Sequence, residues 1–252
     1  MRSVRTLLAS LTLAAALPAC GPSYFLTMHP SSGSGTWANG AEIARQQHDS
    51  LEVRLSFVRY EASRLIFEAE LRNRSGHDFT VSPTDFYLQP VATQPVASTA
   101  PAPVLPGRLT AFDPEPNIQE LRQRIEVESA EATKVSAAEV LTSLSHTVEN
   151  VAAIKKKETK EQISARENRQ QNENASFDSQ RLRAAAAAEQ HRAQLGELEG
   201  QALRRTTLET GRAVRGYVYF PRADMADVIR VSAPGLAPGT TLDFTQTRTQ
   251  QH

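Results

Sequence analysis

The sequence predicts an α+β protein in which an antiparallel β-sandwich is interrupted by an inserted long α-helical hairpin. Apolar and polar residues alternate with a period of two from Leu51 to Leu71 and again from Val214 to Phe220, which is typical of half-buried strands. The chain between these two parts is rich in Ala, Gln, Glu and Arg. Its apolar residues recur at three- and four-residue steps, which is typical of helices. Short strands separated by frequent Pro and Gly residues favour a sandwich.

The N-terminal residues have the layout of a secretory signal. Arg2 and Arg5 precede a short apolar run from Leu7 to Leu17, and small residues follow this run. The run is too short to span a bilayer, which needs about 20 apolar residues. We therefore expect residues 1–19 to be a signal peptide that is absent from the mature protein.

The end of this segment, Leu17-Pro18-Ala19-Cys20, resembles the lipobox of bacterial lipoproteins. In the lipobox a leucine lies three residues before a cysteine and a small residue directly precedes it, so Leu17 and Ala19 match while Pro18 is a less usual middle residue. The resemblance implies that Cys20 becomes the mature N-terminus and carries acyl chains that anchor the protein in a membrane. The alternative is an ordinary secretory signal that is cut near Ala19 and leaves a free thiol.

Composition excludes several classes of site and partner. Cys20 is the only cysteine, so the chain can form no internal disulfide and no cysteine-based zinc or redox pair. Removal of residues 1–19 takes away two of the 28 basic side chains and none of the 28 acidic ones, which leaves the mature chain close to neutral. Nucleic-acid binding and an electrostatic membrane patch both need a basic excess, and neither is predicted.

The mature chain is expected to begin with a flexible tether over residues 20–48, because this segment contains Pro22, Pro30 and a Ser/Gly run at residues 31–35. The sandwich should occupy residues 49–112 and 206–247, and residues 248–252 should form a tail. Its expected core consists of alternating apolar residues from both parts: Leu51, Val53, Leu55, Phe57, Leu65, Phe67, Leu71, Val218, Phe220, Val231 and Phe244.

The first part of the sandwich begins with two antiparallel strands joined by a short connection at residues 60–63. Glu68 and Glu70 on the second strand could form a catalytic carboxylate pair, but they share the solvent face with Arg54 and Arg72, and ion pairs between strands are expected there. A strand at residues 79–81 follows, and Pro83 marks an edge or a bend. The proline-rich segment 89–107 should be an extended loop that serves as a spacer or a recognition strip.

The helical insertion should span residues 113–205. Asp113 and Pro114 form a helix start, and capping boxes follow at Ser136 and Thr159. One unbroken helix would be roughly 130 Å long and would keep the two strand-rich parts apart. A reversal is therefore required. Residues 155–159 divide the insertion evenly and are preferred to the Asn-rich residues 168–176.

An apolar stripe recurs along the first arm of this hairpin at Leu141, Leu144, Val148 and Val151. Insertion of this stripe into a membrane is disfavoured, because three ionisable residues lie within the same stretch and would be costly in hydrocarbon. These residues are Glu139, His146 and Glu149. We expect the stripe to pack against the return helix or the sandwich.

The second strand-rich part completes a recognisable pattern. The turn at residues 73–75, the corner at residues 83–86, and residues 206–208 followed by Gly211 and residues 216–221 resemble immunoglobulin-like domains of uncharacterised bacterial envelope lipoproteins. This resemblance implies an immunoglobulin-like sandwich and a location in the bacterial cell envelope, and it supplies no catalytic residue. Gly21 is not the aspartate that retains enterobacterial lipoproteins in the inner membrane, so the resemblance favours the outer membrane.

The sequence contains no recognisable catalytic, metal or cofactor motif. Its six histidines are scattered through the predicted tether, turns, helices and tail, without the spacing of a zinc or calcium site. The leading hypothesis is a non-enzymatic interaction or structural module, anchored through Cys20, that binds another envelope protein. A small-ligand carrier or an envelope hydrolase with an unrecognised site are the alternatives. An exposed helical stripe would favour the module, an apolar cavity the carrier, and convergent Ser, His and carboxylate groups the hydrolase.

Overall fold

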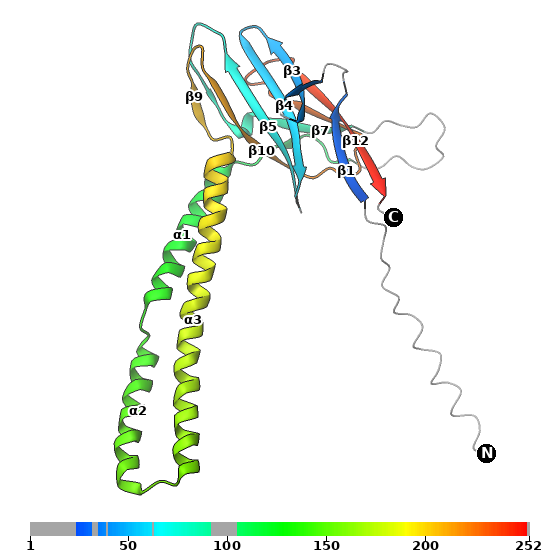
Figure 1. The fold of residues 1–252 in the computed structure, drawn as a ribbon. Coiled ribbons are helices and arrows are strands. Elements are labelled where there is room, and N and C mark those ends of the chain that lie inside the picture. The colour runs from blue at the N-terminus through cyan, green and yellow to red at the C-terminus, as the bar shows by residue number, and fades with distance from the viewer. Residues whose placement is uncertain (1–23, 32–34, 39, 62, 92–104, 251–252) are drawn as a thin grey trace, which may run out of the picture.

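A computed structural model describes residues 24–31, 35–38, 40–61, 63–91 and 105–250. The fold is mixed α+β, with antiparallel sheets at one end and a helical hairpin that projects from them (Figure 1). The predicted signal peptide, its Leu17-Pro18-Ala19-Cys20 segment and most of the proline-rich loop lie outside the described residues. None of the helices in the described ranges is both long and apolar enough to cross a membrane.

The strands of the described residues form two five-stranded sheets and one two-stranded sheet, all antiparallel. In spatial order, the first sheet consists of β1 (Tyr24–Pro30), β12 (Thr241–Gln250), β11 (Val228–Ser232), β7 (Tyr87–Val91) and β8 (Leu109–Thr110). The second sheet consists of β10 (Ala213–Pro221), β5 (Arg64–Asn73), β4 (Leu51–Tyr60), β3 (Ala41–His48) and β2 (Thr36–Ala38). The small sheet pairs β6 (Phe79–Val81) with β9 (Thr206–Leu208).

The two large sheets share one hydrophobic core. Phe67 of the second sheet packs against Phe244 of the first in a tilted arrangement with ring centroids 4.8 Å apart, and it also meets Phe220 edge to face at 6.1 Å. Every residue of the predicted core belongs to this cluster, except that Phe57 is half-buried and packs against its edge. Period-two alternation therefore identified the inward-facing side chains correctly.

The prediction of a flexible tether over residues 20–48 is wrong for the part that the structure describes. Strand β1 pairs along its whole length with β12, from Tyr24 opposite Gln250 to Pro30 opposite Phe244. Met28 and Ala44 are buried in the core. Without β1, the exposed edge of β12 would have unpaired backbone groups. The same pairing keeps residues 248–250 in the sheet, so the predicted tail is also too long.

The hairpin of β4 and β5 and the bend at Pro83 are confirmed. The two strands pair from Leu51 opposite Asn73 to Tyr60 opposite Leu65. Pro83 begins a short 3-10 turn, Pro83–Asp85, which the Ser82 side chain caps by accepting a hydrogen bond from the Thr84 backbone N–H. This turn moves the chain from the small sheet into β7.

The insertion contains three helices: α1 (Pro114–Thr133), α2 (Ala137–Lys156) and α3 (Lys160–Gln201). Asp113 caps α1 as predicted, and the preferred reversal is confirmed. Lys157 has a left-handed backbone with φ 50°, and Thr159 and Gln162 form the capping box that starts α3. Helix α3 runs unbroken through residues 168–176. The first arm is instead interrupted between α1 and α2, where Ser136 caps α2.

Both ends of the insertion are held by strand β10. The Phe112 backbone N–H donates to the Tyr219 carbonyl oxygen at 2.8 Å, and the Leu203 N–H donates to the Tyr217 carbonyl oxygen at 2.9 Å. Leu203 belongs to the shared core. Gly216 lies directly beneath it, and a Cβ atom there would lie 2.5 Å from the Leu203 backbone nitrogen. The base of the hairpin is therefore built into the sheets.

We expect the sheets to fold without the projecting helices. Replacement of residues 119–200 by a short Gly/Ser loop keeps Leu203 and should leave one cooperative unfolding transition, because loop closure depends only weakly on loop length. Replacement of residues 117–205 also removes Leu203 and should be less stable by about 2–5 kcal/mol. Urea denaturation measures both variants. An unfolded first variant, or equal stability of the two, would contradict this assignment.

Candidate functional site

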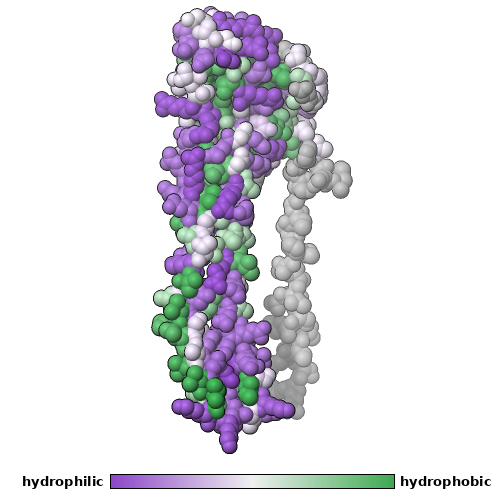
Figure 2. Space-filling model, turned by 60° about the vertical axis from the view of Figure 1, so that its left-hand side comes forward, coloured by the Kyte–Doolittle hydropathy of each residue, from purple (hydrophilic) through white to green (hydrophobic). Residues whose placement is uncertain are grey.

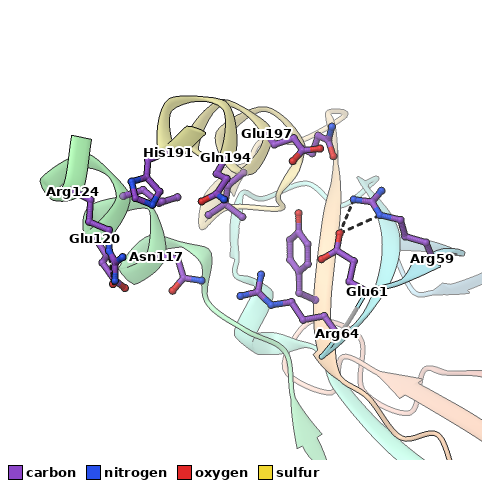
Figure 3. A pocket seen from close by; sticks show the side chains of 13 residues that line it. Arg59, Glu61, Arg64, Asn117, Glu120, Arg124, His191, Gln194 and Glu197 are labelled. Carbon is purple, nitrogen blue, oxygen red and sulfur yellow. Dashed lines mark hydrogen bonds and ion pairs between the residues drawn. The ribbon is translucent and has the colours of Figure 1, made fainter. Parts of the chain in front are cut away.

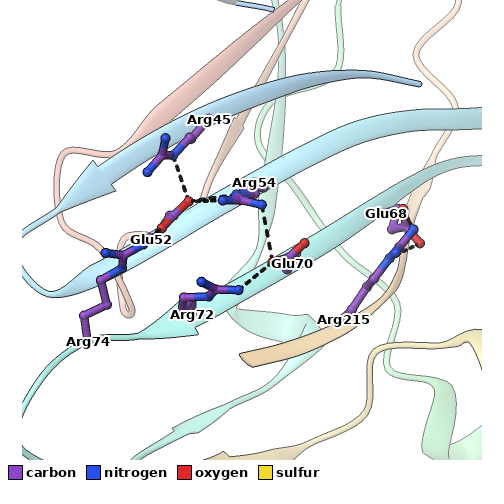
Figure 4. Close-up of polar contacts among 8 residues, drawn as sticks. All are labelled: Arg45, Glu52, Arg54, Glu68, Glu70, Arg72, Arg74 and Arg215. Carbon is purple, nitrogen blue, oxygen red and sulfur yellow. Dashed lines mark hydrogen bonds and ion pairs between the residues drawn. The ribbon is translucent and has the colours of Figure 1, made fainter. Parts of the chain in front are cut away.

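Glu68 and Glu70, the possible catalytic carboxylates of the sequence analysis, are paired with arginines (Figure 4). Glu68 accepts two hydrogen bonds from the Arg215 guanidinium, both at 2.6 Å. Glu70 lies 3.6 Å from Arg54 and 4.0 Å from Arg72. Each carboxylate therefore lies beside at least one arginine on the outer face of the second sheet, as the solvated-face interpretation predicts. The arrangement stabilises neighbouring strands and offers no acid and base that face a common substrate.

Glu52, on the same face, was not singled out from the sequence. It is 1% exposed and is covered by Arg45, Arg54 and Arg74, each with a nitrogen 2.7 Å from a carboxylate oxygen. Burial raises the pKa of Glu52, but the hydrogen bonds from Arg54 and Arg74 lower it more, so the pKa lies below the usual value. A carboxylate held ionised in this way is a poor general base near neutral pH. Its role is to join β3, β4 and the end of β5.

A cavity of about 470 Å³ lies between the base of the hairpin and the second sheet (Figure 3). Its charged groups are mostly paired: Arg59 donates to Glu61 at 2.8 Å, and Arg124 donates to Glu120 at 2.6 Å. The cavity also contains His191, which contacts Glu128 at 2.8 Å. Such a polar lining does not suit an apolar ligand, and among the described residues that line it there is no serine. The cavity favours neither the carrier nor the hydrolase.

Metal binding receives no support from the part of the chain that the structure describes. Across those ranges, no group of three His, Cys, Asp or Glu side chains is placed to hold a metal ion. The charged side chains near the cavity form separate ion pairs instead of a converging ligand set.

Helix α2 carries a stripe of large apolar side chains that are 48–82% exposed (Figure 2). We call this set the α2 stripe: Val140, Leu141, Leu144, Val148, Val151 and Ile154. The expectation that it packs against the return helix or the sandwich is wrong. The periodicity of the helix was predicted correctly, but the direction in which its apolar face points was not.

The polar face of α2 is turned toward α3 instead. Arg181 of α3 donates to both carboxylate oxygens of Glu139, at 2.8 and 2.6 Å. His146 contacts Glu173 at 2.5 Å, and Arg169 donates to Glu149. Glu139, His146 and Glu149 are partly shielded positions that recur at three- and seven-residue steps, so they share one face of the helix. The α2 stripe lies on the opposite face.

Helix α1 packs closely against α3, whereas α2 makes few contacts with it. The alanine run at residues 184–188 lies between Arg181, which contacts Glu139 of α2, and His191, which contacts Glu128 of α1, and Ala188 is buried. Near α2, helix α3 presents long polar side chains such as Arg166, Arg169 and Arg181. Figure 1 shows α2 standing away from α3. Ion pairs between long side chains bridge this space.

No protein-family model, curated protein or solved structure matches this chain. The functional argument therefore rests on the geometry of its own residues. Among the features described above, the α2 stripe is the one without a structural use inside the chain. Exposed apolar surfaces of this kind are typical of sites that contact another molecule.

Glu52 should make stability depend on pH. Because its pKa is lowered on folding, its contribution is present above the unfolded pKa of about 4.3 and is lost as the pH falls through the lower folded value. Glu52→Gln should cost about 1.5–3 kcal/mol at pH 7 and should weaken this dependence. The measurement is the urea midpoint between pH 7 and pH 3. Glu68→Gln, which removes a more exposed pair, should cost less than about 1 kcal/mol, and equal losses would contradict the assignment.

Proposed function

We propose that this protein is a lipid-anchored lipoprotein of the bacterial cell envelope that acts as a non-enzymatic interaction module. In this proposal the sheets form an immunoglobulin-like sandwich, Cys20 carries the lipid, and the hairpin presents the binding surface. The lipobox-like segment Leu17-Pro18-Ala19-Cys20 supports the anchor. The shared core of two five-stranded sheets supports the sandwich. Gly21 favours the outer membrane by the same resemblance.

The observation that carries the proposal is the outward direction of the α2 stripe. Complete burial of a Val, Leu or Ile side chain contributes about 1.5–3 kcal/mol, so a partner that covers the stripe could gain on the order of 10 kcal/mol. Association costs about 4–15 kcal/mol in lost freedom. The gain from covering the stripe is therefore of the same order as the cost of forming a specific complex. The cavity at the base of the hairpin, which is lined largely by paired charges, offers no comparable apolar area to a carried ligand.

The stripe should be required for partner binding but not for folding. Leu144→Asp places a charge in the middle of the stripe and should reduce recovery of envelope partners by at least about 10-fold, because a buried unpaired charge is costly. Leu182→Asp is the matched control, since Leu182 is also largely exposed, 71% against 58% for Leu144, but lies on α3. Both variants should unfold within about 0.5 kcal/mol of the wild type.

Crosslinking in intact cells, followed by mass spectrometry, provides the measurement. Equal recovery by the wild type and both variants would contradict the use of the stripe. The binding surface would then lie on the strands or in the proline-rich loop.

The anchor has an independent test. The wild type should yield a mature N-terminus at Cys20 that carries acyl chains, whereas Cys20→Ala should yield an unlipidated precursor. Inhibition of lipoprotein signal peptidase should leave residues 1–19 attached to the wild type. Mass spectrometry of the N-terminal peptide measures all three, and a free, unacylated mature N-terminus would contradict the anchor.

A further inference from the structure

We infer that the α2 stripe binds the α2 stripe of a second copy of this chain, with the two helices antiparallel. This inference rests on the proposed use of the stripe as a binding surface and names its occupant. It follows from the spacing of the stripe, from its internal symmetry, and from the charges at the tip of the hairpin.

The central residues of the stripe have the spacing of a coiled-coil seam. Leu141, Leu144, Val148 and Val151 are separated by three, four and three residues, which is the a and d pattern of a heptad repeat. The flanking positions carry uncharged, exposed side chains: Ala138, Ser145, Thr147 and Ala152. In coiled coils, charges at such flanking positions set which chain is bound. The flanking positions of the stripe carry no charges that would select a different chain.

The four central residues of the stripe are symmetrically spaced about residue 146. In an antiparallel pair centred there, Leu144 of one copy lies opposite Val148 of the other, and Leu141 lies opposite Val151. A two-fold contact uses the same patch on both subunits, so it requires such self-complementarity. His146 itself points to the other side of the helix, where it contacts Glu173, and therefore brings no charge into the contact.

Charges at the tip decide between the antiparallel and parallel arrangements. Lys155, Lys156, Lys157 and Lys160 are exposed at the tip, and Glu158 between them is already paired with Arg166. A parallel pair would place the two lysine clusters side by side. An antiparallel pair centred at residue 146 separates them by about 33 Å at 1.5 Å per residue. This separation is about four times the Debye length at physiological salt, so their repulsion is screened.

The antiparallel pair also leaves room for the sheets. The tip of one hairpin would reach the break between α1 and α2 of the other, near Ser136. Helix α1, which is 20 residues and therefore about 30 Å long, separates this point from the sheets. The hairpin projects freely beyond that helix (Figure 1). The contact can therefore use all of α2 without a clash.

The oligomeric state in solution tests the inference. The mature chain, with Cys20→Ser to prevent lipidation, should be a dimer by light scattering between about 1 and 100 µM, a range that spans moderate affinities. Leu182→Asp should remain a dimer. Leu144→Asp places two charges in one symmetric contact and should weaken dimerisation by at least about 100-fold.

Single cysteines in the same Cys20→Ser chain test the orientation with a short thiol crosslinker. Ser145→Cys lies next to the proposed two-fold axis and should crosslink to its own mate. Ala138→Cys should not, because its mate would be about 24 Å away along the helices. Crosslinking at both positions would indicate a parallel dimer and would overturn the antiparallel arrangement.

Other occupants give different results. A wild type that stays monomeric throughout the concentration range overturns the inference. A wild type that stays monomeric and binds anionic phospholipid vesicles through the stripe overturns the inference as well. In either case, stripe-dependent capture of a different envelope protein in cells would leave the proposed function intact. Loss of both self-association and stripe-dependent capture would overturn the proposed function as well.

Discussion

The architecture depends on one constraint: a long helical insertion must leave and re-enter the sheets at neighbouring points. Strand β10 satisfies it with the carbonyl groups of Tyr217 and Tyr219, which hold Leu203 and Phe112. Close approach of the returning chain requires Gly216, because a side chain there would overlap the Leu203 backbone. Once both ends are fixed, α1 and α3 must lie side by side, and α2 is carried to the far end of the hairpin.

The orientation of α2 follows from polar contacts that are individually weak. Surface ion pairs contribute about 0–1 kcal/mol each, so the bridges from α2 to Arg181, Glu173 and Arg169 add little stability. Their effect is directional, because they hold the polar face inward and leave the apolar face in water. Helix α2 should therefore be among the least stable parts of the fold. A partner that binds the ordered helix would stabilise it by mass action.

The sequence predicted the features that arise from local chemistry. The alternation of apolar and polar residues predicted the core strands, and the capping box at Thr159 predicted where the helical hairpin reverses. Strand β1 was missed because Pro22 before it, Pro30 at its end and the Ser/Gly run after it are typical of linkers, while its partner β12 is more than 200 residues away. The burial of Glu52 and the outward direction of the α2 stripe were missed for a related reason. Both are set by side chains on other elements, and periodicity within one element contains no information about them.

A lipid anchor and a stripe of moderate affinity would reinforce each other. Copies attached to one membrane surface by Cys20 have a higher effective concentration than copies in solution, so a contact that is weak in solution becomes populated on the membrane. The uncharged flanks of the stripe fit this situation, because confinement supplies the encounters that charge steering provides for freely diffusing partners. The lysines at the tip would then act against the parallel arrangement without weakening the antiparallel one. An apolar helix face that would be a liability on a freely diffusing monomer becomes usable when its partner is held nearby.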